Sequence, residues 1–233
     1  MSKINWPEIK EYAQLMALNL FVRFKNLNEY MKVMFNFYGN PAFAKADSYL
    51  TLSYLFKNPF QISKRFLMDK GECELQPYGE TPLTTLELIA DESRLSISDT
   101  IYELGCGRGR SCFWLNQFIG AKVVGVEQVP EFVQRAKEVA EKFNVKGLEF
   151  RNEDMLKCDL KDATAVYIYG TGYPAEFINR LARHLEKLPR GAKVISVSYP
   201  ISEYAPKVAF EVMKRFPARF TWGTTDVYIQ QKI

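Results

Sequence analysis

The amino-acid sequence predicts an α/β fold: a doubly wound sheet of seven strands, mostly parallel, with a C-terminal antiparallel hairpin and an N-terminal helical extension. From residue 81 onward, short β-rich runs alternate with helical segments, which is typical of a parallel sheet covered by helices on both faces. A glycine-rich stretch follows the first of these runs. Two final runs flank Trp222-Gly223, as expected for a hairpin that adds antiparallel strands to a mixed sheet.

Residue patterning gives the order of the elements. Thr81 followed by Pro82 is typical of a helix N-cap with proline at the first helical position. Leu83, Leu86 and Ile89 give the helix that follows an apolar face. Further helices are expected at 110–119, 130–143 and 174–188. Strands are expected at 100–104, 122–126, 148–151, 163–169, 193–198, 209–220 and 225–230. The sixth of these runs also allows a partly helical segment.

The first 70 residues differ in composition from the rest of the chain. They hold 10 Lys and Arg against 5 Asp and Glu, whereas the remaining residues hold 21 against 22. They also contain 14 of the 33 aromatic residues. The net charge of +4 therefore originates in one segment, which is suited to face an anionic partner. An aromatic-rich helical cap on the main domain is the alternative.

This basic segment is expected to consist of helical pieces. Near-helical spacing is found in one set of its apolar residues: Tyr12, Leu15, Met16, Leu20 and Phe24. Turns are expected at 39–41 and 58–59, where Asn precedes Pro, and Gly71 is suited to a hinge. We therefore divide the chain into an N-terminal extension at 1–77 and a main domain at 78–233.

Composition excludes several classes of protein. With 47% hydrophobic residues the chain is too apolar to be disordered, and no apolar run approaches the roughly 18 residues of a membrane span. The N-terminus lacks the apolar core of a signal peptide, so we expect a cytoplasmic protein. The four cysteines form no Cys-x-x-Cys pair, so we expect reduced thiols and no metal site.

The stretch from Glu103 to Gly109 reads Glu-Leu-Gly-Cys-Gly-Arg-Gly and lies between a predicted strand and a predicted helix. Its glycines allow a tight turn and a close approach of a ligand to the backbone. The dinucleotide fingerprint would need glycine where this sequence has Arg110. A carboxylate at Glu103 would repel a pyrophosphate and attract an ammonium or sulfonium group. The loop therefore favours a cationic nucleoside ligand over NAD.

Two further acids follow the next two predicted strands. Glu127 lies 20 residues after Gly107, a distance at which an acid reaches ribose hydroxyls in doubly wound folds. Asp154 follows the third strand, where a carboxylate can accept a hydrogen bond from an adenine amino group, and Met155 offers the ring an apolar contact. Three acids at strand ends would be costly in a core without a ligand.

Taken together, these motifs resemble the first three motifs of class I (seven-β-strand) S-adenosylmethionine-dependent methyltransferases, over about residues 78–233. The resemblance implies a Rossmann-like fold, S-adenosyl-L-methionine as cofactor and S-adenosyl-L-homocysteine as product. It also implies that Glu103 and the loop backbone hold the methionine amino end, Glu127 the ribose and Asp154 the adenine.

A narrower resemblance lies upstream. The sequence Tyr78-Gly79-Glu80-Thr81 is similar to a loop of the histone-lysine methyltransferases that lack a SET domain, the disruptor-of-telomeric-silencing type, in which it covers the cofactor. It implies that Tyr78, Glu80 and Thr81 lie over the methionine end; an ordinary turn and helix cap is the alternative. The cofactor-binding residues expected in all are Tyr78, Glu80, Thr81, Glu103, Gly105, Cys106, Gly107, Gly109, Glu127, Gln128, Asp154, Met155 and Tyr169.

The fourth motif departs from the histone enzymes. Those enzymes carry two asparagines after the fourth strand, where this chain has Tyr169-Gly-Thr-Gly-Tyr173-Pro174. This motif is closer to the ATP-synthase c-subunit type of lysine methyltransferase, which has an aromatic-Gly step there and a basic, membrane-proximal N-terminal region. It is unlike the (Asp/Asn)-Pro-Pro-aromatic motif of enzymes that methylate amino groups of DNA and RNA bases. No sequence-specific nucleic-acid partner is therefore expected.

The expected activity is transfer of methyl to a protein lysine amino group by in-line displacement, in which the cofactor supplies the reactive group and the protein supplies positioning. The catalytic candidates are Tyr169, Tyr173 and Tyr78. We expect them to line an aromatic, water-poor channel that lowers the pKa of the acceptor lysine. A small-molecule methyltransferase with residues 1–77 as a lid, and a non-catalytic cofactor-binding protein, are the alternatives.

Other candidate groups have structural interpretations. His184 is expected to be a solvated helix residue, and Cys106 is expected to be structural rather than nucleophilic. Arg110 is expected to pair with Glu80 or Asp154, or to point to solvent. A protein substrate is the expected partner, and the first 70 residues allow peripheral contact with an anionic surface, including a membrane.

Overall fold

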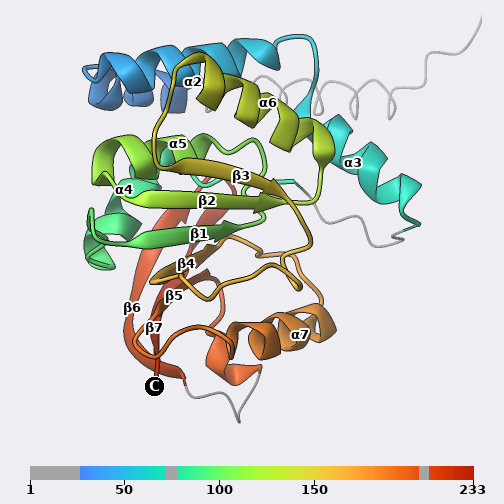
Figure 1. Ribbon diagram of the computed structural model, residues 1–233, viewed down its shortest axis with the longest axis vertical. Helices are drawn as coiled ribbons and strands as arrows, with labels where there is room; N and C mark the ends of the chain where they lie inside the picture. Colours follow the sequence, from blue (N-terminus) through green and yellow to red (C-terminus); the bar gives the residue numbers. More distant parts are fainter. Residues whose placement is uncertain (1–26, 72–77, 205–209) are drawn as a thin grey trace, which may run out of the picture. The chain divides into compact units, whose positions relative to one another are not determined.

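The computed structural model describes residues 27–71, 78–204 and 210–233 (Figure 1). The chain divides into two compact units, which are residues 1–39 and 40–233. Among the described residues, no helix combines the length and the apolar character needed to cross a bilayer.

The first unit contains a helix over residues 27–37. The rings of Tyr30 and Tyr38 meet edge to face near its end, with 6.3 Å between their centroids. The apolar positions predicted from Tyr12 to Phe24 lie outside the described residues.

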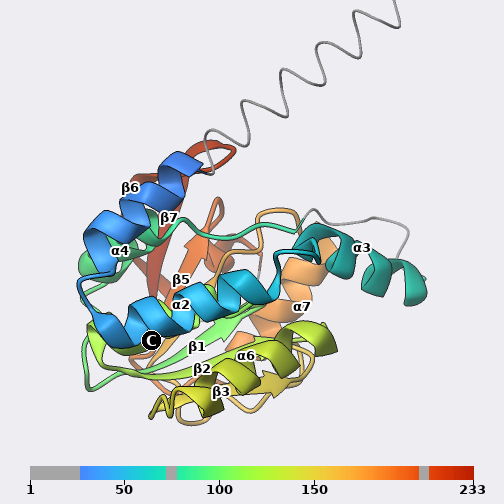
Figure 2. The ribbon, with the colours of Figure 1, turned by 90° about the horizontal axis from the view of Figure 1, so that it is seen from above.

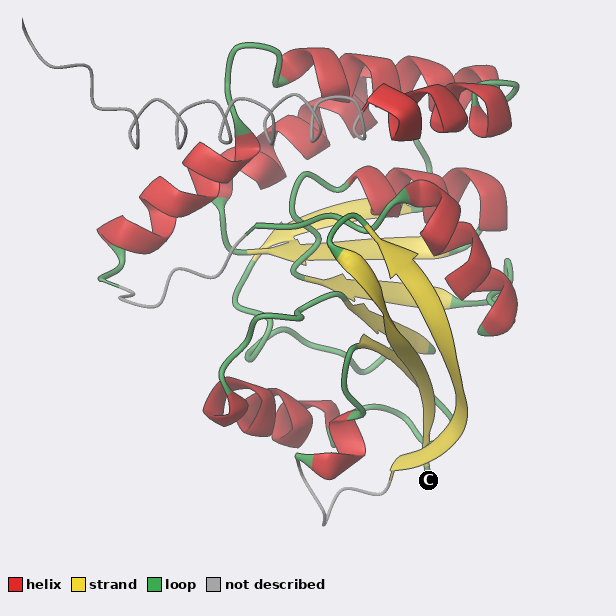
Figure 3. Cartoon of the chain, turned by 180° about the vertical axis from the view of Figure 1, so that it is seen from behind, coloured by secondary structure: helices red, strands yellow, loops and turns green. Residues whose placement is uncertain are grey.

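The second unit is built on one seven-stranded sheet with the strand order β3-β2-β1-β4-β5-β7-β6. The first five strands run parallel, and β7 lies antiparallel between β5 and β6. The strands are β1 (Thr100–Leu104), β2 (Lys122–Glu127), β3 (Leu148–Asn152), β4 (Ala165–Ile168), β5 (Lys193–Val197), β6 (Phe210–Phe220) and β7 (Gly223–Lys232). Figure 3 shows the long C-terminal strands flanking the parallel part. The predicted fold class, including the terminal hairpin, is confirmed.

The predicted strands lie close to the observed ones because each is a short apolar run bounded by turn residues. The partly helical alternative for the sixth run is wrong. Phe210–Phe220 is a strand throughout and pairs with β7 along its length, with a bulge between Val212 and Lys214.

Helices cover both faces of the sheet (Figures 1 and 2). On one face lie α4 (Leu83–Glu92), α5 (Arg110–Trp114) and α6 (Pro130–Lys142), and α5 continues as a π-helix over Leu115–Ile119. The opposite face is covered by α7 (Ala175–Leu185). A short 3₁₀-helix over Ile201–Glu203 packs beside α7.

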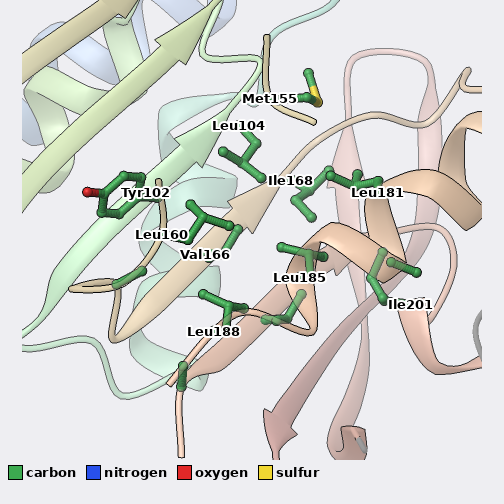
Figure 4. Close-up of a cluster of buried hydrophobic side chains, with 14 of the residues drawn as sticks. Tyr102, Leu104, Met155, Leu160, Val166, Ile168, Leu181, Leu185, Leu188 and Ile201 are labelled. Carbon is green, nitrogen blue, oxygen red and sulfur yellow. The ribbon is translucent and has the colours of Figure 1, made fainter. Parts of the chain in front are cut away.

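A cluster of buried apolar side chains fills the space between α7 and the sheet (Figure 4). Tyr102 and Leu104 of β1, Ile168 of β4, and Leu181 and Leu185 of α7 are each at most 1% exposed. Burial of one such side chain stabilises a fold by about 1.5–3 kcal/mol. This core fixes the ends of the parallel strands, after which the polar candidate residues follow.

The two Asn-Pro pairs predicted as turns are helix starts. Asn40 precedes α2 (Pro41–Ser53), and Asn58 precedes α3 (Pro59–Asp69). Each asparagine side chain accepts hydrogen bonds from backbone N–H groups of the first turn, at 2.9–3.2 Å. Proline at the first helical position costs no hydrogen bond, because its N–H would have no partner inside the helix.

Helix α2 packs on α5 and α6 within the second unit (Figure 2). Arg110 at the start of α5 forms a bidentate ion pair with Asp47 of α2, at 2.6 Å and 2.8 Å. This corrects the prediction that Arg110 pairs with Glu80 or Asp154, or points to solvent. The predicted boundary after residue 77 does not coincide with the division after Gly39.

Two local predictions are wrong. Thr81 does not cap α4, because Pro82 is the cap residue; the Thr81 hydroxyl lies 2.5 Å from the hydroxyl of buried Tyr167 instead. His184 is not solvated but 6% exposed, with Nε2 2.8 Å from the carbonyl oxygen of Cys158. Burial lowers the pKa of this imidazole.

Candidate active site

A cavity of about 420 Å³ opens at the carboxyl ends of β1 to β4. Ligand sites of doubly wound folds lie at this edge, and small-molecule pockets measure about 300–1,000 Å³. We call it the cofactor cavity. Its lining comes from segments that follow these strands, from Tyr78-Gly79 and from α3: Ser63, Phe66, Leu67, Tyr78, Gly79, Gly105, Gly107, Val126, Glu127, Gln128, Val129, Glu153, Met155, Tyr169, Gly170, Thr171, Gly172, Tyr173, Pro174 and Phe177.

The glycine loop after β1 needs its glycines. Gly107 and Gly109 have φ of 55° and 78°, in the left-handed region that other residues rarely adopt. A methyl group on Gly107 would lie 2.9 Å from the Tyr78 hydroxyl oxygen, and one on Gly109 would lie 2.4 Å from the ring of Phe150. Gly109 caps α5 and is not among the cavity-lining residues, so its role there is to shape the loop.

Glu127 stands at the end of β2 and lines the cofactor cavity. Its carboxylate accepts hydrogen bonds from the backbone N–H groups of Gly107 and Val129, both at 2.9 Å. Burial raises the pKa of this carboxyl group above its ordinary value, and the backbone N–H groups oppose that rise. The side chain therefore connects the glycine loop to the next strand and holds its carboxylate at the cavity wall.

Glu103, at the carboxyl end of β1, is 5% exposed. The Ser111 hydroxyl donates a hydrogen bond to one carboxyl oxygen at 2.6 Å, and the Cys112 thiol donates to the other at 3.1 Å. Burial is the main cause that raises the pKa of Glu103 to about 7. The group is therefore poised between neutral and charged forms near neutral pH.

A second, small cavity of about 20 Å³ lies beside Glu103. Gly79, Gly105 and Tyr169 line both cavities, so the two are neighbours. Its other lining residues are Glu80, Thr81, Glu103, Cys106, Arg110 and Ser111. A space of this size accommodates about one water-sized polar group. The Glu103 end of the site is therefore polar and narrow.

The Tyr-Gly-Glu-Thr loop lies over the glycine loop. Arg108 donates two hydrogen bonds to the Glu80 carboxylate, at 2.5 Å and 2.6 Å. The Tyr78 hydroxyl donates to Glu80 at 2.5 Å and accepts from the Arg108 backbone N–H at 3.3 Å. Burial would raise the pKa of Glu80, but Arg108 and these hydrogen bonds lower it to about 2. The turn-and-cap alternative does not account for this network, because Thr81 caps no helix.

Two tyrosines after β4 complete the cavity wall. The ring of Tyr169 packs against Gly79, where a methyl group would lie 2.8 Å from a ring carbon. The hydroxyl of Tyr173 approaches Gly105, where a methyl group would lie 3.2 Å from its oxygen. Burial raises the pKa of Tyr169, so its hydroxyl stays protonated at neutral pH.

The remaining predicted residues occupy different positions. Met155 and Gln128 line the cofactor cavity. Asp154 is not among the lining residues; it accepts a hydrogen bond from Gln128 at 3.4 Å and one from the Leu156 backbone N–H at 2.9 Å. Cys106 is buried at 6% exposure and lines only the small cavity.

The sequence reasoning missed the contribution of α3. Ser63, Phe66 and Leu67 on this helix line the cofactor cavity, and Lys70 donates a hydrogen bond to the Gln128 amide oxygen at 2.5 Å. The amphipathic pattern of residues 59–69 was an available signal for a helix that covers an apolar surface.

The cofactor cavity suits S-adenosylmethionine on chemical grounds. A carboxyl-rich end with Glu103 and Glu127 favours a ligand that carries positive charge on an amino and a sulfonium group. The glycine backbone allows that ligand to approach the main chain closely, and Met155 offers an apolar contact for a base.

Comparison with known proteins identifies the family. Residues 103–208 match the model of the ANTKMT methyltransferase domain. A curated protein-lysine N-methyltransferase from Saccharolobus islandicus (strain REY15A) is 30% identical over 140 residues, which span 58% of this chain and 84% of the relative.

Solved structures support the same fold. An RNA methyltransferase from Salinibacter ruber, in complex with S-adenosyl-L-homocysteine, superposes with a TM-score of 0.54 at 26% identity, over 66% of this chain and 93% of that chain. TrmN from Thermus thermophilus superposes with a TM-score of 0.55 at 12% identity, over 64% and 48% of the two chains. The chain therefore belongs to the protein-lysine N-methyltransferase family of class I S-adenosylmethionine-dependent methyltransferases.

Proposed function

We propose that this methyltransferase transfers methyl to the side-chain amino group of lysine in a protein substrate. The observation that carries the proposal is the aromatic end of the cofactor cavity, where Tyr169 and Tyr173 approach the glycine loop and Tyr78 lies over it. A narrow aromatic wall suits a long aliphatic chain that ends in an amine. The curated relative, a protein-lysine N-methyltransferase, supports the same acceptor.

S-adenosylmethionine supplies an activated methyl group on a positively charged sulfur. We assign Glu127 to the ribose hydroxyls, because its carboxylate is held at the cavity wall by two backbone N–H groups. Glu103 and the backbone around Gly105 are assigned to the methionine end, and Met155 to the base. Asp154 is assigned to the base through Gln128, the neighbour to which it is hydrogen-bonded.

In this proposal, the acceptor nitrogen must be neutral, because an ammonium group has no lone pair. The nitrogen lone pair forms the new N–C bond while the C–S bond breaks and its electron pair stays on sulfur. The methylated ammonium product then loses a proton to water. Desolvation among Tyr78, Tyr169 and Tyr173 favours the neutral amine, since burial lowers the pKa of a lysine.

The N-terminal part of the chain is proposed to contact an anionic surface, including that of a membrane. In support, α2, α3 and the turn between them present exposed large apolar side chains beside basic ones. The apolar residues are Leu52, Leu55, Phe56, Phe60 and Met68, and the basic residues are Lys57, Lys64, Arg65 and Lys70. Apolar side chains that enter an interface beside lysines are typical of peripheral attachment.

The lysine proposal is tested by incubating the enzyme with methyl-labelled S-adenosylmethionine and a dialysed cell lysate, followed by separation by size. We expect label in protein, and acid hydrolysis of that protein is expected to release methylated lysine. Label in an extractable low-mass fraction would favour a small-molecule acceptor. A protein that binds the cofactor without forming S-adenosylhomocysteine would be non-catalytic. The Glu127→Ala variant is the control for lysate enzymes.

A further inference from the structure

The turn between β6 and β7 brings a tryptophan to the candidate active site. The Trp222 indole Nε1–H donates a hydrogen bond to the Tyr169 hydroxyl oxygen at 2.8 Å. Trp222 lies 53 residues after Tyr169 in the sequence and outside all the motifs that predicted the site. The C-terminal hairpin therefore reaches the wall assigned to the acceptor.

Ring packing fixes this tryptophan in place. The rings of Phe220 and Trp222 stack with 5.7 Å between centroids and 12° between planes. The Phe220 ring also lies 5.6 Å from that of Tyr169, and Phe220 is only 3% exposed. Trp222 itself is 53% exposed. One side of the indole is thus held by Phe220, while more than half of the residue faces solvent beside Tyr169.

The hydrogen bond defines what the Tyr169 oxygen can still do. A phenol oxygen has two lone pairs and one proton. The Trp222 N–H occupies one lone pair, which leaves the second available to accept an N–H from an amine in the neighbouring cavity. Tyr169 lines both the cofactor cavity and the small polar cavity, so its oxygen is at the junction where an acceptor amine would arrive.

We propose that Trp222 is a positioning residue for the acceptor lysine. Its exposed indole attracts the lysine ammonium from solvent through a cation–π interaction. Its N–H orients the Tyr169 oxygen, which then directs the neutral amine toward the methyl group. This inference rests on the proposed lysine function.

The test compares Trp222→Phe, Trp222→Ala and the control Thr221→Ala, an exposed neighbour in the same turn. The probe is dialysed lysate protein with labelled cofactor, and methylated lysine is measured at several lysate concentrations. Trp222→Phe keeps a ring and removes the N–H, so we expect kcat to fall about 2- to 10-fold. Trp222→Ala also loses the ring, so we expect the apparent KM to rise about 2- to 5-fold in addition. Cofactor affinity by calorimetry should stay unchanged in all three variants.

A double-mutant cycle with Tyr169→Phe separates positioning from a merely structural role. In the Tyr169→Phe background, Trp222→Phe should have no further effect on kcat, since the hydrogen bond is already absent. Additive losses, unchanged turnover in Trp222→Phe, or a parallel loss of cofactor affinity would overturn the inference. If the wild type forms no methylated lysine, the proposed function itself fails, which is a different result.

Discussion

Three glutamates around the cofactor cavity differ in their proton affinity because their surroundings differ. Glu80 is held ionised by Arg108, with a pKa of about 2. Burial raises the pKa of Glu103 to about 7, although Ser111 donates a hydrogen bond to it. At neutral pH the loop over the site is therefore charged, while the carboxyl group at the end of β1 titrates.

The first prediction concerns pH and cofactor affinity. A positively charged ligand beside Glu103 stabilises its ionised form, so binding below about pH 7 must release a proton. We expect cofactor affinity to increase between about pH 6 and about pH 8 in the wild type, and this dependence to be lost in Glu103→Gln. Calorimetry over that pH range measures it. A Glu211→Gln variant, changed on the exposed face of β6, serves as control and should retain the wild-type profile.

The same group affects folding stability without ligand. Since the folded-state pKa of Glu103 is raised, the native state keeps its proton after the unfolded chain has lost it. The free energy of unfolding should therefore fall from about pH 4.5 to about pH 7, by up to about 3 kcal/mol from this group, and stay level above. Urea unfolding of wild type and Glu103→Gln at each pH checks this; equal slopes in both would contradict the assigned origin.

The second prediction concerns Glu127. Glu127→Ala removes charge-assisted hydrogen bonds to the ribose and frees the Gly107 and Val129 N–H groups that the carboxylate now accepts. We expect cofactor affinity to fall by about 1.5–3 kcal/mol, or roughly 10- to 150-fold. Calorimetry measures the loss, and Lys157→Ala, an exposed change near the same edge, should leave affinity unaltered. An unchanged dissociation constant for Glu127→Ala would refute the ribose assignment.

At the scale of elements, α2 is joined to the helix that follows the glycine loop. Asp47 is 1% exposed, and its carboxylate faces the Arg110 guanidinium in a bidentate pair. The attraction of Asp47 outweighs desolvation and raises the pKa of Arg110, so this guanidinium stays charged. Removal of one partner leaves the other charge buried without compensation.

The third prediction follows from that pair. Asp47→Ala should lower the free energy of unfolding by about 3–5 kcal/mol, because the Arg110 charge remains buried between α2 and α5. Replacing both residues, in Asp47→Ala with Arg110→Met, should recover much of this loss. Urea unfolding monitored by circular dichroism measures both, with the exposed change Asp69→Ala as control. A loss no larger than that of Asp69→Ala would show that the pair contributes little to stability.

At the scale of the whole molecule, the compact unit that carries the sheet starts at Asn40. It includes α2, which packs on α5 and α6, and α3, which lines the cofactor cavity. The first unit, residues 1–39, has its own internal contacts. The basic, aromatic N-terminal segment is therefore not one structural module.

The fourth prediction compares two truncations. Deleting residues 1–39 should leave a folded chain that binds cofactor, because the second unit keeps its sheet, α2 and α3. Deleting residues 1–70 should cause aggregation or a large loss of thermal stability, since it exposes the apolar surface under α2 and leaves Arg110 unpaired. Gel filtration and thermal unfolding with and without S-adenosylhomocysteine measure both. Soluble, cofactor-binding protein from the longer deletion would contradict this prediction.

The sequence by itself determined what depends on local patterning. Periodicity and turn residues predicted the strands closely, and the spacing of the Gly105–Gly109 loop and Glu127 predicted a cofactor edge that the structure forms. These features were accessible because a strand, a helix start and a tight turn depend mainly on neighbouring residues.

Only the tertiary structure decided which distant residues meet. It paired Asp47 with Arg110, buried His184 beneath α7, and joined Trp222 to Tyr169 across the hairpin. None of these follows from local spacing, because an exposed helix face and a buried one differ only in what packs against them. The partners of charged and aromatic side chains are chosen by the packing of elements far apart in sequence.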